Sequence, residues 1–134
     1  MDQHTFRAIL DNFNTTSTDI RASVLLTKDG LALVSASPHA CPPPGDEDRM
    51  SALSASILHL GHKFMDDFGG GELAQVLIKG KDGSMLTIHG QELALTVLTK
   101  PDAEAGLIFS QMQRVVDSLR LPPFLLLAGL AQDS

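Results

Sequence analysis

Aromatic residues are scarce in this 134-residue chain, which has no Trp, no Tyr and only six Phe. Proteins that bind single-stranded nucleic acid stack bases on aromatic rings, so the composition disfavours that class. Basic residues are also few, since 10 Lys and Arg stand against 16 Asp and Glu and the net charge is −6. Nucleic acids and anionic membrane surfaces both attract a basic face, so we expect neither as a partner.

Disulfides, membrane spans and leader sequences are equally unsupported by the sequence. The single cysteine, Cys41, cannot form an internal disulfide. The longest apolar run, Leu121–Leu130, is too short to span a bilayer and contains Pro122-Pro123. The N-terminus carries acidic and polar residues before any apolar stretch, unlike a signal peptide. With 43% hydrophobic residues the chain can bury a core without a metal or disulfide, and we expect no cofactor. Together with the single cysteine and the polar N-terminus, this predicts a cytoplasmic protein.

Apolar periodicity predicts three helices and five strands in one domain. We expect an N-terminal helix within residues 1–18, a core at 20–119 and an apolar tail at 121–134. The expected order after the N-terminal helix is strands at Ile20–Thr27 and Leu31–Ser37, a helix at Glu47–Phe68, strands within 72–80, 84–90 and 92–100, and a helix from about Asp102 to about Arg120. The N-terminal helix has Phe6, Ile9, Leu10 and Phe13 on one face. The last helix has Ile108, Met112, Val115, Val116 and Leu119 inward and Leu107 alongside. Asp46 and Asp102 are the expected N-caps of the last two helices.

The tripeptide Lys-Asp-Gly occurs twice, at residues 28–30 and 81–83, each time between two apolar runs. Asp-Gly is a strong hairpin signal because Gly tolerates positive φ and Asp tolerates the left-handed region. Both copies are therefore predicted to turn the chain, and Gly90-Gln91 offers a further reversal. The result is one hairpin followed by a three-stranded meander, giving an antiparallel sheet.

Both faces of these strands are apolar. Side chains alternate along a strand, so Val24 and Leu26 lie on the face opposite Leu25, and the later strands show the same pattern. A sheet with one wet face would show cleaner alternation of apolar and polar residues. We therefore expect an α/β domain of three layers, with helices on both faces of a five-stranded antiparallel sheet.

The helix at Glu47–Phe68 has more apolar surface than one sheet can cover. One stripe comprises Met50, Leu53, Ile57, Leu60, Phe64 and Phe68, and a second comprises Ala55, Leu58, His62 and Met65. A helix lying on a sheet needs only one such stripe. We expect the surplus to meet another chain, with Leu53, Ile57 and Phe64 toward the sheet and the second stripe toward the partner, although the pattern also allows the reverse.

The chain resembles the roadblock family of dynein-light-chain-like proteins, and in particular its bacterial MglB-like members. The resemblance covers roughly Ile20 to Leu119. It is carried by "ASVLLTKDGLALVSA", by the helix and meander "DRMSALSASILHLGHKFMDDFGGGELAQVLIKGKDGSMLTIHG" and by "ELALTVLTKPDAEAGLIFSQMQRVVDSL". The individual motifs are an Asp-Gly hairpin, a Gly-rich helix exit and an apolar lead into the meander. The resemblance implies a roadblock/profilin-like fold.

The resemblance also implies a homodimer in which the long helices pack together and the edge strands of the meander pair. Mapped onto this chain, the interface residues would be Ala55, Leu58, His62, Met65, Leu73, Gln75 and Leu77. Family members bind small Ras-like GTPases as regulators or scaffolds, and MglB-like proteins activate GTP hydrolysis without supplying an arginine finger. Such an activity would act here by ordering the catalytic loops of the partner. Exposed charged residues for that contact would be Asp48, Arg49 and Lys63.

The end of the chain departs from the MglB-like pattern. A C-terminal extension can contribute to GTPase contacts in that group, whereas "RLPPFLLLAGLAQDS" is short, apolar and interrupted by two prolines. The departure bears on GTPase activation more than on GTPase binding. Leu125–Leu127 can dock on their own domain or on a partner, and the sequence does not decide between them.

Several motifs that suggest chemistry have simpler explanations. His59, His62 and Asp66 follow a spacing that can ligate zinc, but no fourth ligand is evident and no metal is expected. Gly69-Gly70-Gly71 follows a helix, whereas phosphate-binding glycine loops precede one, so it is a helix exit. Asp29 and Asp82 lie at hairpin tips rather than in an acid–base pair. Cys41 precedes three prolines in a loop and is interpreted as incidental rather than as a reactive thiol.

Three function classes remain open at this stage. The resemblance favours a non-enzymatic homodimeric regulator or scaffold of a small Ras-like GTPase. A small-molecule sensor module is the alternative, and it requires a buried pocket with converging polar groups. An enzyme is disfavoured because no catalytic constellation, such as a G-x-S-x-G elbow, occurs in the sequence.

Overall fold

The computed structural model describes residues 3–27, 29–37, 46–90 and 92–119. Its elements are α1 (Gln3–Asn14), β1 (Ile20–Thr27), β2 (Ala32–Ala36), α2 (Glu47–Asp67), β3 (Gln75–Lys79), β4 (Ser84–His89), β5 (Leu93–Thr99) and α3 (Ala105–Ser118). The predicted three helices and five antiparallel strands are confirmed, with strand order β2-β1-β5-β4-β3. The predictions for Cys41 and for the tail at 121–134 lie outside the described residues.

Both Asp-Gly pairs lie in turns, as predicted. Gly30 has φ of 91° and donates a hydrogen bond from its amide to the carbonyl of Thr27 at 3.0 Å. In the second turn the amide of Gly80 donates to the carbonyl of Gly83 at 2.8 Å. Asp29 and Asp82 are therefore turn residues, each exposed to solvent. Two short links of this kind fix the register of β1 with β2 and of β3 with β4.

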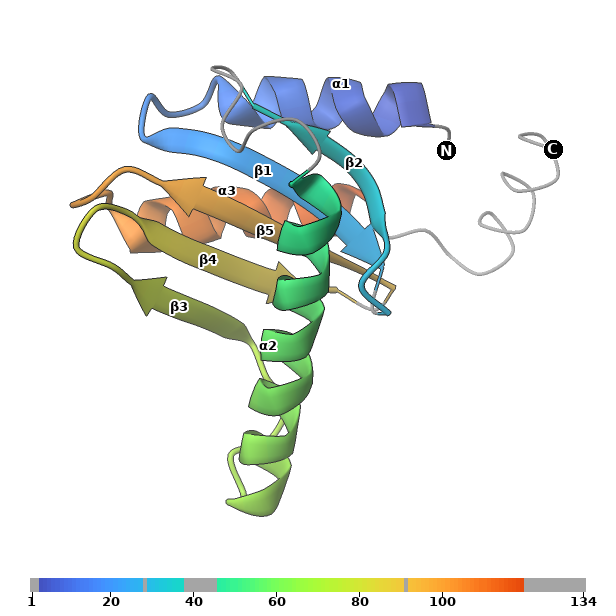
Figure 1. Cartoon of the computed structure of the whole chain (residues 1–134), viewed down its shortest axis with the longest axis vertical. Helices are drawn as coiled ribbons and strands as arrows, with labels where there is room; N and C mark the ends of the chain where they lie inside the picture. The colour runs from blue at the N-terminus through green and yellow to red at the C-terminus, as the bar shows by residue number, and fades with distance from the viewer. Residues whose placement is uncertain (1–2, 28, 38–45, 91, 120–134) are drawn as a thin grey trace, which may run out of the picture.

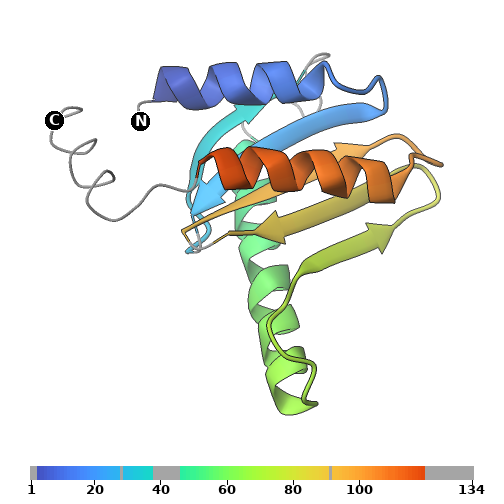
Figure 2. The same ribbon diagram turned by 180° about the vertical axis from the view of Figure 1, so that it is seen from behind.

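The sheet is covered on both faces, which confirms the three-layer prediction (Figures 1 and 2). Helices α1 and α3 lie together on one face, α1 over β1 and β2 and α3 over β4 and β5, whereas α2 lies on the other. The larger core lies under α1 and α3 and contains Leu10, Phe13, Leu25, Leu86, Ile88, Leu95, Val97, Ile108 and Met112. A smaller core lies under α2 and contains Val24, Leu26, Leu58 and Ala94.

Buried polar groups join the layers. The side-chain amide of Asn14 on α1 donates to the main-chain oxygen of Ala36 at 3.1 Å and accepts from the hydroxyl of Ser23 at 2.8 Å. On the α2 face the hydroxyls of Thr87 and Thr96 lie 2.6 Å apart, and both residues are fully buried. Every buried side-chain polar atom of the described residues has a hydrogen-bond partner.

Helix α3 begins later than predicted. It starts at Ala105, and Asp102 adopts φ of 65° in the preceding turn, where Asp is one of the few residues that tolerate the left-handed region. Asp102 is therefore not the N-cap. The inward face includes Phe109, which the sequence reading missed, while Leu107 is 56% exposed.

Helix α2 crosses the strands and extends past the free edge of the sheet at β3 (Figure 1). Asp46 occupies its N-cap position, as predicted, but makes no side-chain capping hydrogen bond. The helix ends before three glycines, two of which have positive φ (72° at Gly69 and 80° at Gly71), so the predicted helix exit is confirmed. The C-terminal half of α2 thus lies largely beyond its own sheet.

Candidate protein-interaction site

The side of α2 that faces the sheet is built from small and polar residues. Ser51 and Ser54 are 0% and 2% exposed, and Leu58 is the one large apolar residue buried there, at 6%. The Ser51 hydroxyl donates to the carbonyl of Gly30 at 2.8 Å, while a Cβ on Gly30 would lie 2.9 Å from that of Ala55. Small side chains at these positions allow the helix to approach the β1–β2 hairpin closely.

The two apolar stripes of α2 are therefore assigned in reverse. Leu58 packs on the sheet with Ala55 beside it, so in the protomer these residues face the sheet, which is the reverse orientation that the sequence also allowed. Leu53, Ile57 and Phe64 were expected to face the sheet. Leu53 and Phe64 are instead 55% and 57% exposed, and Ile57 is half-buried. The physical reason is that Ser51 and Ser54 of the helix and Gly30 of the hairpin are small. They allow the two backbones to come close on this side of the helix, and this side therefore faces inward.

The other residues predicted at the interface lie around the exit of α2. The His62 ring packs edge-on against His89 with ring centroids 4.6 Å apart. The His89 ring nitrogens lie 2.8 Å from the carbonyl oxygen of Leu73 and 3.0 Å from that of Gly90. Met65 is half-buried, and its carbonyl accepts from the amide of Gly70 at 2.8 Å. His62, Met65 and Leu73 thus hold the segment that leads from α2 into β3.

The outward side of α2 carries large exposed apolar side chains, which we call the outer stripe: Leu53, Leu60, Phe64 and Phe68, at 55%, 69%, 57% and 75% exposure. The rings of Phe64 and Phe68 pack together with centroids 4.9 Å apart. A contiguous exposed apolar patch of this kind marks an interaction surface. The sequence identified the stripe but oriented it toward the sheet.

The β3 edge also carries exposed apolar residues. Among the described strands β3 pairs only with β4, and its residues Gln75, Leu77 and Ile78 are exposed, with Leu77 at 46% and Ile78 at 47%. Pairing places Ile78 opposite Met85, which in turn lies opposite Leu98. These three residues form an apolar row, which we call the open row, on the α2 face of the sheet. Each is exposed or only half-buried.

The residues predicted to contact a GTPase do not lie together in one protomer. Asp48 and Arg49 are exposed in the first turn of α2, and Lys63 lies about 22 Å further along the helix at 1.5 Å per residue. Lys63 forms an exposed ion pair with Asp67, with Nζ 3.5 Å from Oδ2. A single contact surface on one protomer would therefore use one end of α2 or the other.

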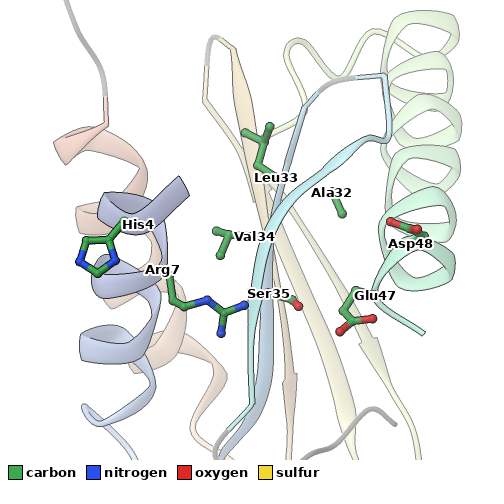
Figure 3. Close-up of a pocket in the computed structure, with 8 residues that line it drawn as sticks. All are labelled: His4, Arg7, Ala32, Leu33, Val34, Ser35, Glu47 and Asp48. Carbon is green, nitrogen blue, oxygen red and sulfur yellow. The ribbon is translucent and has the colours of Figure 1, made fainter. Parts of the chain in front are cut away.

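A hollow of about 360 Å³ lies at the β2 edge (Figure 3). His4 and Arg7 of α1 lie on one side of β2, and Glu47 and Asp48 of α2 lie on the other. The strand separates the basic from the acidic groups, so the polar side chains do not converge on a common point. This arrangement does not resemble the enclosed polar pocket that a small-molecule sensor requires.

The described residues contain neither a metal-binding cluster nor a membrane-spanning helix. Across residues 3–27, 29–37, 46–90 and 92–119, no three His, Cys, Asp or Glu side chains lie close enough to share a metal ion. In that part of the chain no helix is long and apolar enough to cross a membrane.

Residues 8–99 match the sequence profile of the Roadblock/LC7 domain. The chain belongs to the Roadblock/LC7 family. The match runs from α1 to the end of β5 and so contains all five strands and α2, while α3 lies beyond it. No curated protein sequence matches the chain.

Solved structures place the fold within the same family. A Roadblock/LC7 domain from Streptomyces avermitilis superposes with a TM-score of 0.77 at 26% identity, covering 89% of this chain and 96% of that one. MglB from Myxococcus xanthus gives 0.75 at 18% identity, covering 87% and 86%. Profilin II from Acanthamoeba castellanii gives 0.57 at 13% identity, covering 84% and 94%. The roadblock/profilin-like fold predicted from the sequence is confirmed.

Proposed function

We propose that this Roadblock/LC7 chain forms a homodimer through β3 and the outer stripe of α2, and that the dimer is a non-enzymatic regulator or scaffold of a small Ras-like GTPase. The observation that carries the proposal is the α2 half that extends past β3 with Leu60, Phe64 and Phe68 exposed. A helix that leaves its own sheet with its apolar residues uncovered needs a second surface.

Two-fold symmetry supplies that surface in a self-complementary way. Antiparallel pairing of two β3 strands continues the sheet from one protomer into the next and turns the second protomer round. Within one protomer α2 passes over the end of the sheet where His62 meets His89, and the open row of Ile78, Met85 and Leu98 lies toward the opposite end. After the two-fold rotation, the projecting half of each α2 lies over the open row of the other copy. The open row of each copy is then covered, and the two α2 helices lie side by side on one face of the continuous sheet, where their outer stripes can pack together.

The exposed interface residues on β3 remain part of this proposal. Gln75 and Leu77 lie on the edge that would pair, whereas Ala55 and Leu58 stabilise the protomer from within. Leu73 and His62 support the interface indirectly, because they hold the segment that enters β3. The dimer contact itself comes from the outer stripe.

The GTPase partner is supported by membership of the family and by the resemblance to MglB-like members described above. The chain would act without supplying a catalytic group, by holding the partner's loops in an ordered state. Asp48, Arg49 and Lys63 stay the proposed charged contacts. In a two-fold dimer, the Lys63 end of one α2 lies over the other protomer, so charged groups from both copies can contribute to one surface.

Affinity capture with small Ras-like GTPases from the same genome tests the proposal. The full-length chain is immobilised and exposed to each GTPase loaded with GDP or with a non-hydrolysable GTP analogue. We expect retention of one GTPase with the GTP analogue only. Arg49→Glu or Lys63→Glu should weaken that retention at least tenfold, and Lys100→Glu, an exposed charge at the end of β5, is the matched control. Capture of none in either nucleotide state would contradict the proposed function.

A further inference from the structure

The α3 side of the β3 edge is a second surface that none of the described residues covers, distinct from the outer stripe. Gln75, Leu77 and Lys79 pair opposite Ile88, Leu86 and Ser84, and of these Leu86 and Ile88 belong to the core under α1 and α3. The three β3 residues therefore face the α3 side, where α3 packs on β4 and β5. A hollow of about 490 Å³ lies between β3 and α3, lined by Gln75, Phe109, Ser110, Gln113, Arg114 and Asp117.

In the proposed homodimer, on which this inference rests, the hollow becomes half of a groove. In one protomer α3 lies on the same face of the sheet as this side of β3 (Figure 2). In the dimer two paired β3 strands would form the floor, with two copies of Leu77 near the centre, and the two α3 helices would form the walls. Each α3 lies about one and a half strand spacings from its β3, and one further spacing separates the two β3 strands. At about 4.8 Å per spacing, the α3 axes are about 19 Å apart.

That width has a specific consequence. Packed α-helices have interaxial distances of about 8–10 Å, so a groove about 19 Å wide accommodates one helix in contact with both walls. A second helix would not fit beside it, and an extended strand would leave most of the space unfilled. Because the groove lies on the two-fold axis, it holds one occupant per dimer.

The charges at the groove indicate the chemistry of the occupant. Lys79 on the floor and Arg114 on the wall are exposed, on a chain whose net charge is −6. The carboxylate of Asp117 accepts a hydrogen bond from the Gln113 amide at 2.9 Å and so is directed along its own helix. Lys79 and Arg114 together outnumber Asp117 at the groove, so it carries a small excess of positive charge on an acidic protein and favours acidic groups at the margins of an apolar helix.

We propose that the α3–β3 groove of the dimer binds a single amphipathic α-helix of a partner protein, with its apolar face on the two copies of Leu77 and acidic residues toward Lys79 and Arg114. The residues involved are present twice and converge only when two copies associate. Binding there reports dimer formation, since a monomer offers one wall and half of the floor.

Site-specific photo-cross-linking tests the assignment. Gln113→p-benzoylphenylalanine is introduced into the full-length chain in cells that naturally produce it, and the cross-linked peptides are sequenced by mass spectrometry. Ser118→p-benzoylphenylalanine, at an exposed position outside the groove lining on the same helix, is the matched control. We expect position 113, and not position 118, to label one segment of a second protein at residues spaced three or four apart. Labelling confined to residues 120–134 of this chain, or equal labelling from both positions, would overturn the proposal.

Binding by the purified partner then tests the chemistry. We expect one partner per dimer and a loss of affinity of at least tenfold for Arg114→Glu, which leaves β3 unchanged, and for Leu77→Asp. Leu107→Asp, at a 56% exposed position that is not part of the groove lining, should bind as the parent does. Two partners per dimer, or unchanged affinity for Arg114→Glu, would contradict the groove.

A monomer in light scattering would contradict the dimer that both proposals require. If the chain is a dimer, the remaining outcomes separate the groove from the proposed function. A GTPase that binds the dimer while position 113 labels no helix would leave the proposed function intact and overturn the groove. A labelled helix from a protein other than a GTPase would leave the groove intact, and GTPase capture would then decide the proposed function alone.

Discussion

Phe64→Ser is the most direct perturbation of the proposed dimer. Phe64 is 57% exposed in the protomer, and of the roughly 200 Å² that a phenylalanine side chain offers, about 110 Å² is therefore available for a second copy to cover. At about 25 cal/mol per Å² this area is worth about 3 kcal/mol per copy, and a two-fold interface contains two copies. If half of the available area becomes buried, the substitution weakens dimerisation by about 3 kcal/mol, or about 100-fold in Kd.

Sedimentation velocity across a dilution series, from micromolar to nanomolar concentration, measures this change. Leu31→Ser is the matched control, because Leu31 is 67% exposed and lies in the β1–β2 turn, away from the projecting half of α2. We expect Leu31→Ser to dimerise as the parent does. A Kd for Phe64→Ser within threefold of the parent value, with circular dichroism showing an intact fold, would refute the assignment of the outer stripe.

Further predictions concern the protomer. Gly30→Ala should lower the free energy of unfolding by more than Gly69→Ala does. Both glycines have positive φ, but only a Cβ at Gly30 meets another atom, the Ala55 Cβ at 2.9 Å. Gly69→Ala should lower the free energy of unfolding by about 1–2 kcal/mol, and urea unfolding measures both changes. Thr87→Val should cost about 1–3 kcal/mol by leaving the buried Thr96 hydroxyl without that partner, and a double-mutant cycle should show that adding Thr96→Val recovers part of the loss. Asn14→Ala removes a buried amide that hydrogen-bonds to both β1 and β2, so we expect a loss of at least about 2 kcal/mol and faster amide hydrogen exchange in β2; an unchanged melting temperature would contradict this role.

The turns and strands were predictable because their signals are local. Asp29-Gly30 and Asp82-Gly83 require positive φ or tight reversal, and each lies between runs of β-branched and apolar residues. Apolar residues on both faces also predicted helices on both sides of the sheet. The pairing of β1 with β5, which brings the two hairpin systems into one sheet, joins segments about 70 residues apart, and no local pattern encodes it.

The orientation of α2 was not predictable from hydrophobicity alone. The stripe with the larger side chains, including Leu60 and Phe68, is the exposed one, whereas Ser51 and Ser54 are buried. Apolar periodicity identifies only the apolar stripes, whereas the small residues of α2 allow the β1–β2 hairpin to approach the helix. The deciding fact is the contact of Gly30 with the helix, which appears only when the two segments are brought together in space.

The start of α3 shows a similar limit. Asp102 follows a proline and precedes an apolar stripe, which is the usual pattern of an N-cap, yet its backbone lies in the left-handed region and the helix begins at Ala105. The inward stripe nevertheless keeps its predicted phase, because Ile108, Met112 and Val116 are buried. Phe109 joins them, and Leu107 is exposed.

The two margins of the sheet are unlike, and this difference limits how large an assembly can grow. The β2 margin is flanked by ionisable groups, Arg7 on one side and Glu47 on the other, which discourage the addition of another strand, whereas β3 carries uncharged Gln75, Leu77 and Ile78 along most of its length. A chain that can extend its sheet in one direction only stops growing once two copies have met. With the proposed pairing through β3, such an arrangement would give a closed pair rather than a fibre.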